Sequence, residues 1–391
     1  MLARKRLIYE VAWQAGVSEL VFDKLLEELR MLKKVAALML VCASTAAWMG
    51  CGTTTSKYLY ATIPASNEIV AFRMDPNSGA LLQLVGSPIT AGQAVQSLVI
   101  HPSQKFLYAA NSGATPSGTV SLYTISSGGG LTEVTPRQNV GTAPTLLVMD
   151  SSGSFLYVAN SGSLDISVFS INSSTGALTL VPQTGGATAG IGMSALNMEL
   201  SPSGNTLWVT GQVGTQGQIQ EFPVSNGVIG APVAGSPFLT GNGPYGLAID
   251  SGATHLYTAN KIDNSISAFS INSSGALTLI STTAETFTGP VALFIDKSGK
   301  YMYVANQQSS GNLAAYSIGS AGGLTLLTNS PFATGPQPSF ITGDSSGKYL
   351  FVGNQSTPVI QSFSLDPGTG TLTSVNSYSV PGTPTSIAIT Q

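Results

Sequence analysis

The sequence repeats one pattern seven times, and this repeat limits the possible folds more than any other feature. Each copy contains a strand-like segment of the Leu-Tyr type, and successive segments begin 46 to 51 residues apart. A period of roughly 40 to 50 residues, with several short strands in each unit, is typical of a β-propeller. The seven segments begin at Tyr58, Phe106, Phe155, Thr206, His255, Tyr301 and Tyr349.

The clearest copy, residues 155–181, shows how each unit is built. It reads as three strands, FLYVA, ISVFSI and LTLV, separated by Asn, Gly and Ser turns, and an apolar segment such as residues 144–150 supplies a fourth strand. The second of these strands is apolar on both faces, as expected where neighbouring blades of a closed ring cover both sides. One position of that strand is aromatic in every copy: Phe72, Tyr123, Phe169, Phe222, Phe269, Tyr316 and Phe363.

The two ends of the repeat region fit each other. The Leu-Tyr segment at Tyr58 has no innermost segment before it, and the innermost segment at 383–390 has no Leu-Tyr segment after it. Pairing 57–61 with 383–390 completes the first blade and leaves no open sheet edge. We therefore predict an all-β, seven-bladed propeller of four-stranded antiparallel blades over residues 57–391, with the first blade closed by the C-terminal strand.

The N-terminal part differs from the repeats. Residues 1–30 are charged and predicted to be helical. Either translation starts at Met31 and residues 1–30 are not part of the protein, or they form a cytoplasmic extension ahead of a signal anchor. Residues 31–50 carry two lysines and then an uncharged run, which is typical of a signal peptide and short for a membrane span of roughly 20 residues. We therefore predict that the propeller is exported.

The end of this signal resembles a bacterial lipoprotein cleavage site. Gly50 precedes Cys51 directly, although Trp48 stands where such sites usually have Leu. The chain has two cysteines, and the other one, Cys42, lies in the predicted signal, so an exported domain would keep a single cysteine. Lipidation of Cys51 would explain it. We predict a membrane-anchored protein of the cell envelope, with residues 51–56 as a tether; two incidental cysteines in an apolar segment are the alternative.

Charge and motifs exclude several classes of protein. After Cys51 the chain has 8 basic and 13 acidic residues and no basic cluster, which excludes a typical nucleic-acid-binding surface. It contains no P-loop, GxSxG, HExxH or Cys/His metal spacing. We expect no cofactor, no metal and no nucleic-acid partner, and we expect a monomer.

The repeated pattern LYVAN…ISVFSI…GALTL resembles the lactonase family related to 6-phosphogluconolactonase and the wider YVTN-type propellers. The resemblance covers nearly all of the chain after Cys51. It implies a seven-bladed propeller with a pocket of polar and charged side chains at one mouth of the central channel. It also implies hydrolysis of a sugar lactone as the activity.

Candidate site residues come from loops at that mouth. Asp165 and Asp263 are the candidate catalytic acids, because lactone hydrolysis needs a base that activates water. Tyr245 is a candidate channel residue, with packing as the alternative. An asparagine ends five of the Leu-Tyr segments, and these are candidate binding residues with a turn-capping role as the alternative: Asn111, Asn160, Asn260, Asn306 and Asn354.

Two functions from different classes remain open at this point. The resemblance implies an exported lactonase that hydrolyses a sugar lactone at the channel mouth. The scarcity of His, Arg and acidic residues instead favours a non-catalytic surface propeller that binds a glycan, peptide or protein partner. A polar, uncharged mouth would favour binding, and a buried acid beside a cation would favour catalysis.

Overall fold

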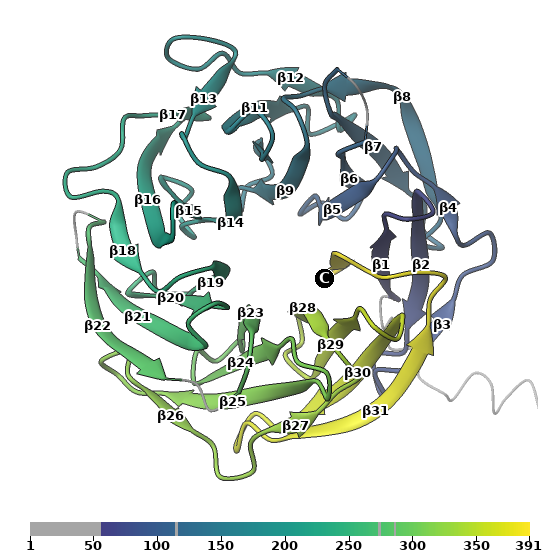
Figure 1. Cartoon of the computed structure of the whole chain (residues 1–391). Coiled ribbons are helices and arrows are strands. Elements are labelled where there is room, and N and C mark those ends of the chain that lie inside the picture. Colours follow the sequence, from purple (N-terminus) through teal and green to yellow (C-terminus); the bar gives the residue numbers. More distant parts are fainter. Residues whose placement is uncertain (1–55, 114–115, 273–274, 285–286) are drawn as a thin grey trace, which may run out of the picture. The chain divides into compact units, whose positions relative to one another are not determined.

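Seven antiparallel sheets surround a common axis in the computed structural model (Figure 1). It describes residues 56–391 apart from 114–115, 273–274 and 285–286, so the predictions for the helix, signal peptide and Cys51 lie outside the described residues. Ser56–Gln391 forms one compact unit. No helix within this unit is long and apolar enough to cross a membrane. The predicted all-β, seven-bladed propeller is confirmed.

Each blade has four strands, which follow one another in order from the axis to the rim. The innermost strands are β5 (Val95–Ile100), β9 (Pro144–Met149), β14 (Ala195–Leu200), β19 (Pro244–Ile249), β23 (Pro290–Ile295), β28 (Pro338–Gly343) and β32 (Ile387–Ile389). The Leu-Tyr strands come next: β1 (Lys57–Ile63), β6 (Phe106–Asn111), β10 (Phe155–Asn160), β15 (Thr206–Val213), β20 (His255–Asn260), β24 (Tyr301–Asn306) and β29 (Tyr349–Asn354).

The outer half of each blade contains a third strand and a rim strand. The third strands are β2 (Glu68–Met74), β7 (Thr119–Ile125), β11 (Asp165–Ile171), β16 (Gln216–Ser225), β21 (Ser265–Ile271), β25 (Asn312–Ile318) and β30 (Val359–Leu365). The rim strands are β3 (Leu81–Gln83), β8 (Leu131–Asn139), β12 (Leu178–Leu180), β17 (Val228–Ile229), β22 (Leu277–Ala284), β26 (Leu324–Leu326) and β31 (Leu372–Ser379). Four blades add a short strand beside the third strand: β4 (Ile89–Thr90), β13 (Thr188–Gly190), β18 (Phe238–Thr240) and β27 (Phe332–Ala333).

The core lies between blades, as the two apolar faces of the middle strands predict. The aromatic Phe169 of β11 is buried in one cluster with Phe106 and Tyr108 of the preceding blade. Equivalent clusters fill the other joints of the ring. Because each cluster draws on two blades, no blade can bury its apolar side chains alone.

A tyrosine–glycine hydrogen bond recurs between neighbouring blades. The tyrosine of a Leu-Tyr strand donates its hydroxyl to a glycine carbonyl in the next blade, at 2.7 to 3.0 Å: Tyr60 to Gly129, Tyr108 to Gly176, Tyr257 to Gly322 and Tyr303 to Gly370. Two features of these turns require glycine: a positive φ and the close approach of an aromatic ring from the preceding blade. At Gly370 the backbone has a φ of +72°, and a Cβ atom would lie 2.5 Å from the ring of Tyr301.

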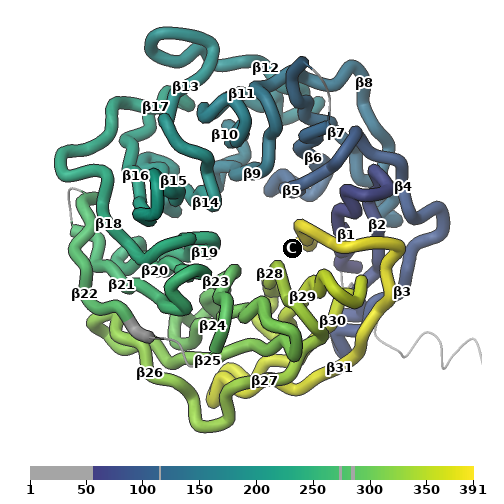
Figure 2. The backbone as a smooth tube through the Cα atoms, viewed as in Figure 1, coloured from purple at the N-terminus to yellow at the C-terminus, as the bar shows by residue number. Residues whose placement is uncertain are grey.

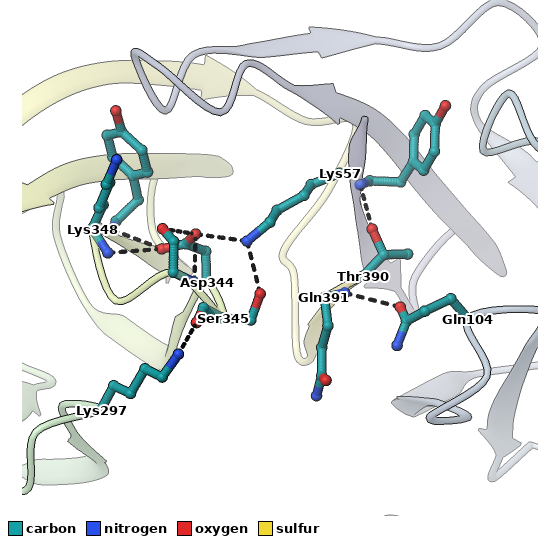
Figure 3. Close-up of polar contacts among 11 residues, drawn as sticks. Lys57, Gln104, Lys297, Asp344, Ser345, Lys348, Thr390 and Gln391 are labelled. Atoms are coloured by element: carbon teal, nitrogen blue, oxygen red, sulfur yellow. Dashed lines mark hydrogen bonds and ion pairs between the residues drawn. The ribbon is translucent and has the colours of Figure 1, made fainter. Parts of the chain in front are cut away.

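The ring is closed by the two ends of the repeat region, which lie side by side (Figure 2). In the first blade, β32 pairs with β1 through Leu59 with Ile389 and Ala61 with Ile387. The backbone N–H of Tyr58 also donates to the hydroxyl of Thr390 over 2.7 Å (Figure 3). The predicted closure is confirmed, although the regular strand begins only at Ile387.

Candidate functional site at the channel mouth

Six innermost strands, together with Thr385 and Ser386 just before β32, line a central cavity of about 640 Å³. Binding pockets for small molecules usually have volumes of roughly 300–1,000 Å³. The N-terminal ends of the innermost strands pair with the C-terminal ends of the Leu-Tyr strands, as Pro144 does with Asn160. Residues at these two kinds of strand end therefore share one mouth of the channel.

A bulge near the start of six innermost strands supplies the residues of this mouth. In each of these strands the pairing register skips one residue, as it skips Tyr245 between Pro244 and Gly246. A bulge leaves the extra residue unpaired and re-aims its side chain. The skipped residues all line the cavity: Gln96, Thr145, Leu196, Tyr245, Val291 and Ser339. Tyr245, a sequence-based candidate for the channel, is one of these lining residues and is 40% exposed, and ligand binding by it stays a prediction.

Three side chains from adjacent blades form a directed chain of hydrogen bonds at the mouth. Lys261 Nζ donates to Gln307 Oε1 over 2.6 Å, and Gln307 Nε2 donates to Gln355 Oε1 over 2.9 Å. Lys261 Nζ also lies 5.0 Å from the centre of the Tyr245 ring, within the range of a cation–π contact. Each of the three follows directly after the asparagine that ends its Leu-Tyr strand. This chain keeps two ammonium protons of Lys261 and the amide of Gln355 available to a ligand.

Glu199 of β14 is the acid of the channel. Among the described residues, Glu199 and Lys261 are the charged side chains that line the central cavity. Glu199 is half-buried in the channel wall, and partial burial raises the pKa of its carboxyl to about 7. Asn197 precedes Glu199 by two residues in β14 and lies nearer the mouth. Its Nδ2 atom donates to the Tyr245 carbonyl over 3.0 Å. Because its pKa is close to neutral, Glu199 can exchange a proton under ordinary conditions.

A second hollow, of about 250 Å³, opens among the C-terminal ends of three innermost strands. Glu199, Leu247, Leu293 and Phe294 line both spaces. Glu199 therefore lies between the mouth and the opposite end of the channel.

The five predicted binding asparagines lie behind the cavity wall rather than in it. All five are buried, with at most 1% of their surface exposed. Three of them donate through Nδ2 to a serine of the adjacent third strand: Asn111 to Ser121, Asn160 to Ser167 and Asn260 to Ser267. Asn306 donates to Asn312 in the same way, whereas both amide atoms of Asn354 are buried without a partner among the described residues. These bonds match the turn-capping alternative, and ligand binding by the five stays a prediction.

The two predicted catalytic acids also lie away from the cavity wall. Asp165 accepts hydrogen bonds from Asn160 over 2.8 Å and from Thr188 over 3.0 Å. Asp263 is exposed in its turn and accepts one from the backbone N–H of Asn242. The structure does not bring the two together with Lys261 and Glu199 around the cavity. Their catalytic role stays a prediction.

Both histidines lie at joints between blades or in turns. His101 Nε2 lies 3.0 Å from the Gly153 carbonyl, and His255 Nδ1 lies 2.9 Å from Asp250 Oδ2. Within residues 56–391, gaps excepted, no group of three or more His, Cys, Asp or Glu side chains could hold a metal ion.

The family is decided by comparison with family models. The model described as lactonase, 7-bladed beta-propeller, matches residues 50–194 and 198–389. The chain belongs to the lactonase family. No curated protein matches this lactonase-family sequence.

Solved structures share the fold of this lactonase-family propeller. One is a "putative 6-phosphogluconolactonase" from Bacteroides fragilis, with 23% identity, a TM-score of 0.74, and 87% of this chain and 99% of that chain covered. A "putative 6-phosphogluconolactonase" from Bacteroides uniformis has 20% identity and a TM-score of 0.73, over 86% and 100% of the two chains. The periplasmic gluconolactonase of Pseudomonas aeruginosa has 17% identity and a TM-score of 0.70, over 86% and 99%. At these identities the likeness shows the fold alone.

The repeat itself contained a signal for the two charged residues of this candidate site. Aligned by strand, the positions equivalent to Glu199 are apolar or hydroxylic in every other blade: Val99, Val148, Ala248, Phe294, Thr342 and Ala388. Lys261 is likewise the one cation at the position after the strand-ending asparagine. A departure from the repeat, rather than a repeated residue, marks the site.

Proposed function

We propose that this lactonase-family propeller hydrolyses a sugar lactone in the central channel, with Glu199 as general base and Lys261, at the mouth, as the cation that holds the carbonyl oxygen. The observation that carries the proposal is that one acid and one cation, Glu199 and Lys261, line a single cavity whose other described lining side chains are uncharged. A base is most effective when its pKa lies near the working pH, and burial raises the pKa of Glu199 to about 7.

The proposed reaction has two steps. The Glu199 carboxylate takes a proton from water while the water oxygen attacks the lactone carbonyl carbon, and the carbonyl oxygen becomes an oxyanion. Lys261 Nζ donates hydrogen bonds to that oxyanion, the role that donors of an oxyanion hole fill. The ring C–O bond then breaks, and the ring oxygen takes the proton back from Glu199, which releases the open hydroxy acid.

The test is hydrolysis of a panel of lactones followed by proton release. Glu199→Gln should lower kcat by about 10²–10⁴-fold, the usual contribution of a general base. In the unmutated protein kcat should rise with pH through about 7, because the base works only when deprotonated. Glu221→Gln is the matched control: it removes another buried acid, at a joint between blades, and should leave kcat unchanged. Full activity of Glu199→Gln would overturn the proposal.

The sequence-based candidates make a competing prediction that the same assay decides. If Asp165 or Asp263 were the base, the double variant Asp165→Asn with Asp263→Asn would lose activity while its melting temperature stayed nearly unchanged. If Glu199 is the base, the double variant Asp165→Asn with Asp263→Asn should keep its lactone-hydrolysing activity.

A second candidate function is non-catalytic binding of a neutral glycan, and the mouth itself favours it. Most of its polar groups are neutral amides and hydroxyls, such as those of Gln96, Thr145 and Thr385. Saturable binding of a glycan, with no turnover of any lactone, would support this function against the first.

We also propose that the protein works in the cell envelope, anchored through lipid on Cys51 and without a nucleic-acid partner. The uncharged run in residues 31–50 and the Gly50-Cys51 junction support export. The gluconolactonase of Pseudomonas aeruginosa, which shares the fold, is described as periplasmic.

A further inference from the structure

The basic residues of the propeller are concentrated away from the channel mouth. Three lysines directly precede Leu-Tyr strands, at the opposite end of those strands from the mouth: Lys105, Lys300 and Lys348. Lys57 and Arg73 belong to the same end, because Tyr58 at the start of β1 pairs with Arg73. Lys297 lies in one of these turns and donates to the Ser345 carbonyl.

The remaining arginine is engaged at the rim. Arg137 of β8 makes two hydrogen bonds to Glu133 in the same strand, at 2.6 and 3.0 Å. Lys261 is therefore the one cation on the cavity wall among the described residues. It is already held by Gln307 and by the Tyr245 ring.

A phosphate ester needs more positive charge than this mouth offers. It has a charge of about −1.5 to −2 near neutral pH and is bound in proteins by arginine forks or several charge-assisted hydrogen bonds. An anion moved out of water without such partners loses much free energy of solvation. Lys261 could neutralise at most one charge, and ionised Glu199 in the same cavity would repel the other.

The neutral groups of the mouth suit hydroxyl groups instead. Amides come from Gln96, Gln307 and Gln355, and hydroxyls come from Thr145, Ser339 and Thr385. Amide and hydroxyl groups both donate and accept, as sugar hydroxyls do. The Lys261–Gln307–Gln355 chain also fixes which way the two amides point, so the amide of Gln355 presents N–H donors.

We infer that the substrate is an uncharged polyhydroxy lactone and that its phosphorylated counterpart is discriminated against. The inference rests on the proposed function and adds the substrate class. It separates this chain from the 6-phosphogluconolactonase activity for which two of its fold relatives are named.

The experiment compares kcat/KM for gluconolactone and 6-phosphogluconolactone under identical conditions. We expect a preference of about 10- to 100-fold for the unphosphorylated lactone. Gln307→Arg places a second cation beside Lys261 and should shift the ratio towards the phosphorylated lactone by about tenfold. Thr132→Arg adds the same charge at an exposed rim position and should leave the ratio unchanged.

The outcomes separate the inference from the proposed function. Equal kcat/KM values, or a preference for the phosphorylated lactone, would overturn the inference while the proposed function stands. Absence of all hydrolysis would overturn the proposed function, and binding of glucose against glucose 6-phosphate, followed by NMR titration, would then decide the inference. Tighter binding of glucose supports it, and equal or weaker binding overturns it.

Discussion

Lys57 and Asp344 join the first blade to the seventh. Lys57 Nζ lies 3.0 Å from Asp344 Oδ2, with 12% of the lysine side chain and 1% of the aspartate side chain exposed (Figure 3). Lys57 also donates to the Ser345 hydroxyl over 2.7 Å. The pair therefore reinforces the joint at which the chain closes on itself.

Replacing Lys57 should destabilise the ring. Lys57→Met leaves the buried Asp344 without its cation, which should cost about 3 kcal/mol of unfolding free energy at pH 7. Lys297→Met is the matched control, because that exposed lysine donates to the same turn without pairing with an acid, and it should cost less than about 0.5 kcal/mol. Denaturant unfolding measures both, and equal stability of the two variants would contradict the prediction.

The effect of Lys57→Met should depend on pH. Burial would raise the pKa of Asp344, but hydrogen bonds from Ser346, Lys57 and the Tyr349 N–H outweigh it and hold the pKa below its ordinary value. A carboxyl with a lowered pKa in the folded state stabilises above its unfolded pKa of about 4 and loses this contribution as pH falls through the folded pKa. The difference between wild type and Lys57→Met should therefore shrink below about pH 4.

Removing residues 384–391 should open the first blade. The deletion takes away β32, which pairs with β1, and the Ser386 carbonyl that accepts the Thr62 N–H. We expect a loss of several kcal/mol, because ladder hydrogen bonds and buried contacts disappear together. Removal of Gln391 alone loses one exposed hydrogen bond to Gln104 and serves as the control. Unchanged denaturant midpoints for the longer deletion would refute the role of closure.

Glu221 should make the propeller less stable as pH rises. It is 1% exposed beside Trp208, and burial raises its pKa to about 7 against a smaller opposing effect of the Trp208 indole. The folded protein then holds a proton that the unfolded chain releases near pH 4.5, so unfolding free energy falls between about pH 4.5 and 7, by up to about 3 kcal/mol. Glu221→Gln should make this part of the curve less steep, and the fall that remains should come from Glu199, whose pKa burial also raises to about 7. Identical curves for wild type and Glu221→Gln would exclude Glu221 as the source.

Cys51 should control membrane attachment. Cys51→Ser should move the propeller from the membrane fraction to the soluble envelope fraction without changing its melting temperature, because Cys51 precedes the first strand. A single acyl chain binds membranes only marginally, so firm attachment of the wild type would indicate several chains. Recovery of the wild type in soluble cytosol with Met1 intact would contradict both export and lipidation.

The fold could be predicted from the sequence because the residues that pack the blades together recur in every repeat. Phe169 and its counterparts fill the joints, and the turn glycines are required by their positive φ and by their contact with the preceding blade. The charged residues of the candidate site, by contrast, occupy positions that do not repeat. Asn160 and its counterparts recur in five blades, and in four of these the Nδ2 atom donates to the adjacent third strand. Glu199 and Lys261 occur once each, and only the closed ring brings their blades around one cavity.

The tyrosine–glycine bond between blades has a consequence for how such a ring can diversify. In the fourth blade Trp208 stands where the tyrosine would be, Gly211 replaces the strand-ending asparagine, and Glu221 faces the tryptophan. The same blade holds Glu199. Seven equivalent modules offer seven equivalent positions on the axis, and a reaction needs one of them to be unlike the rest. We expect relatives with different chemistry to differ from one another most in this module, and least in the four blades whose tyrosines donate to a glycine of the next blade.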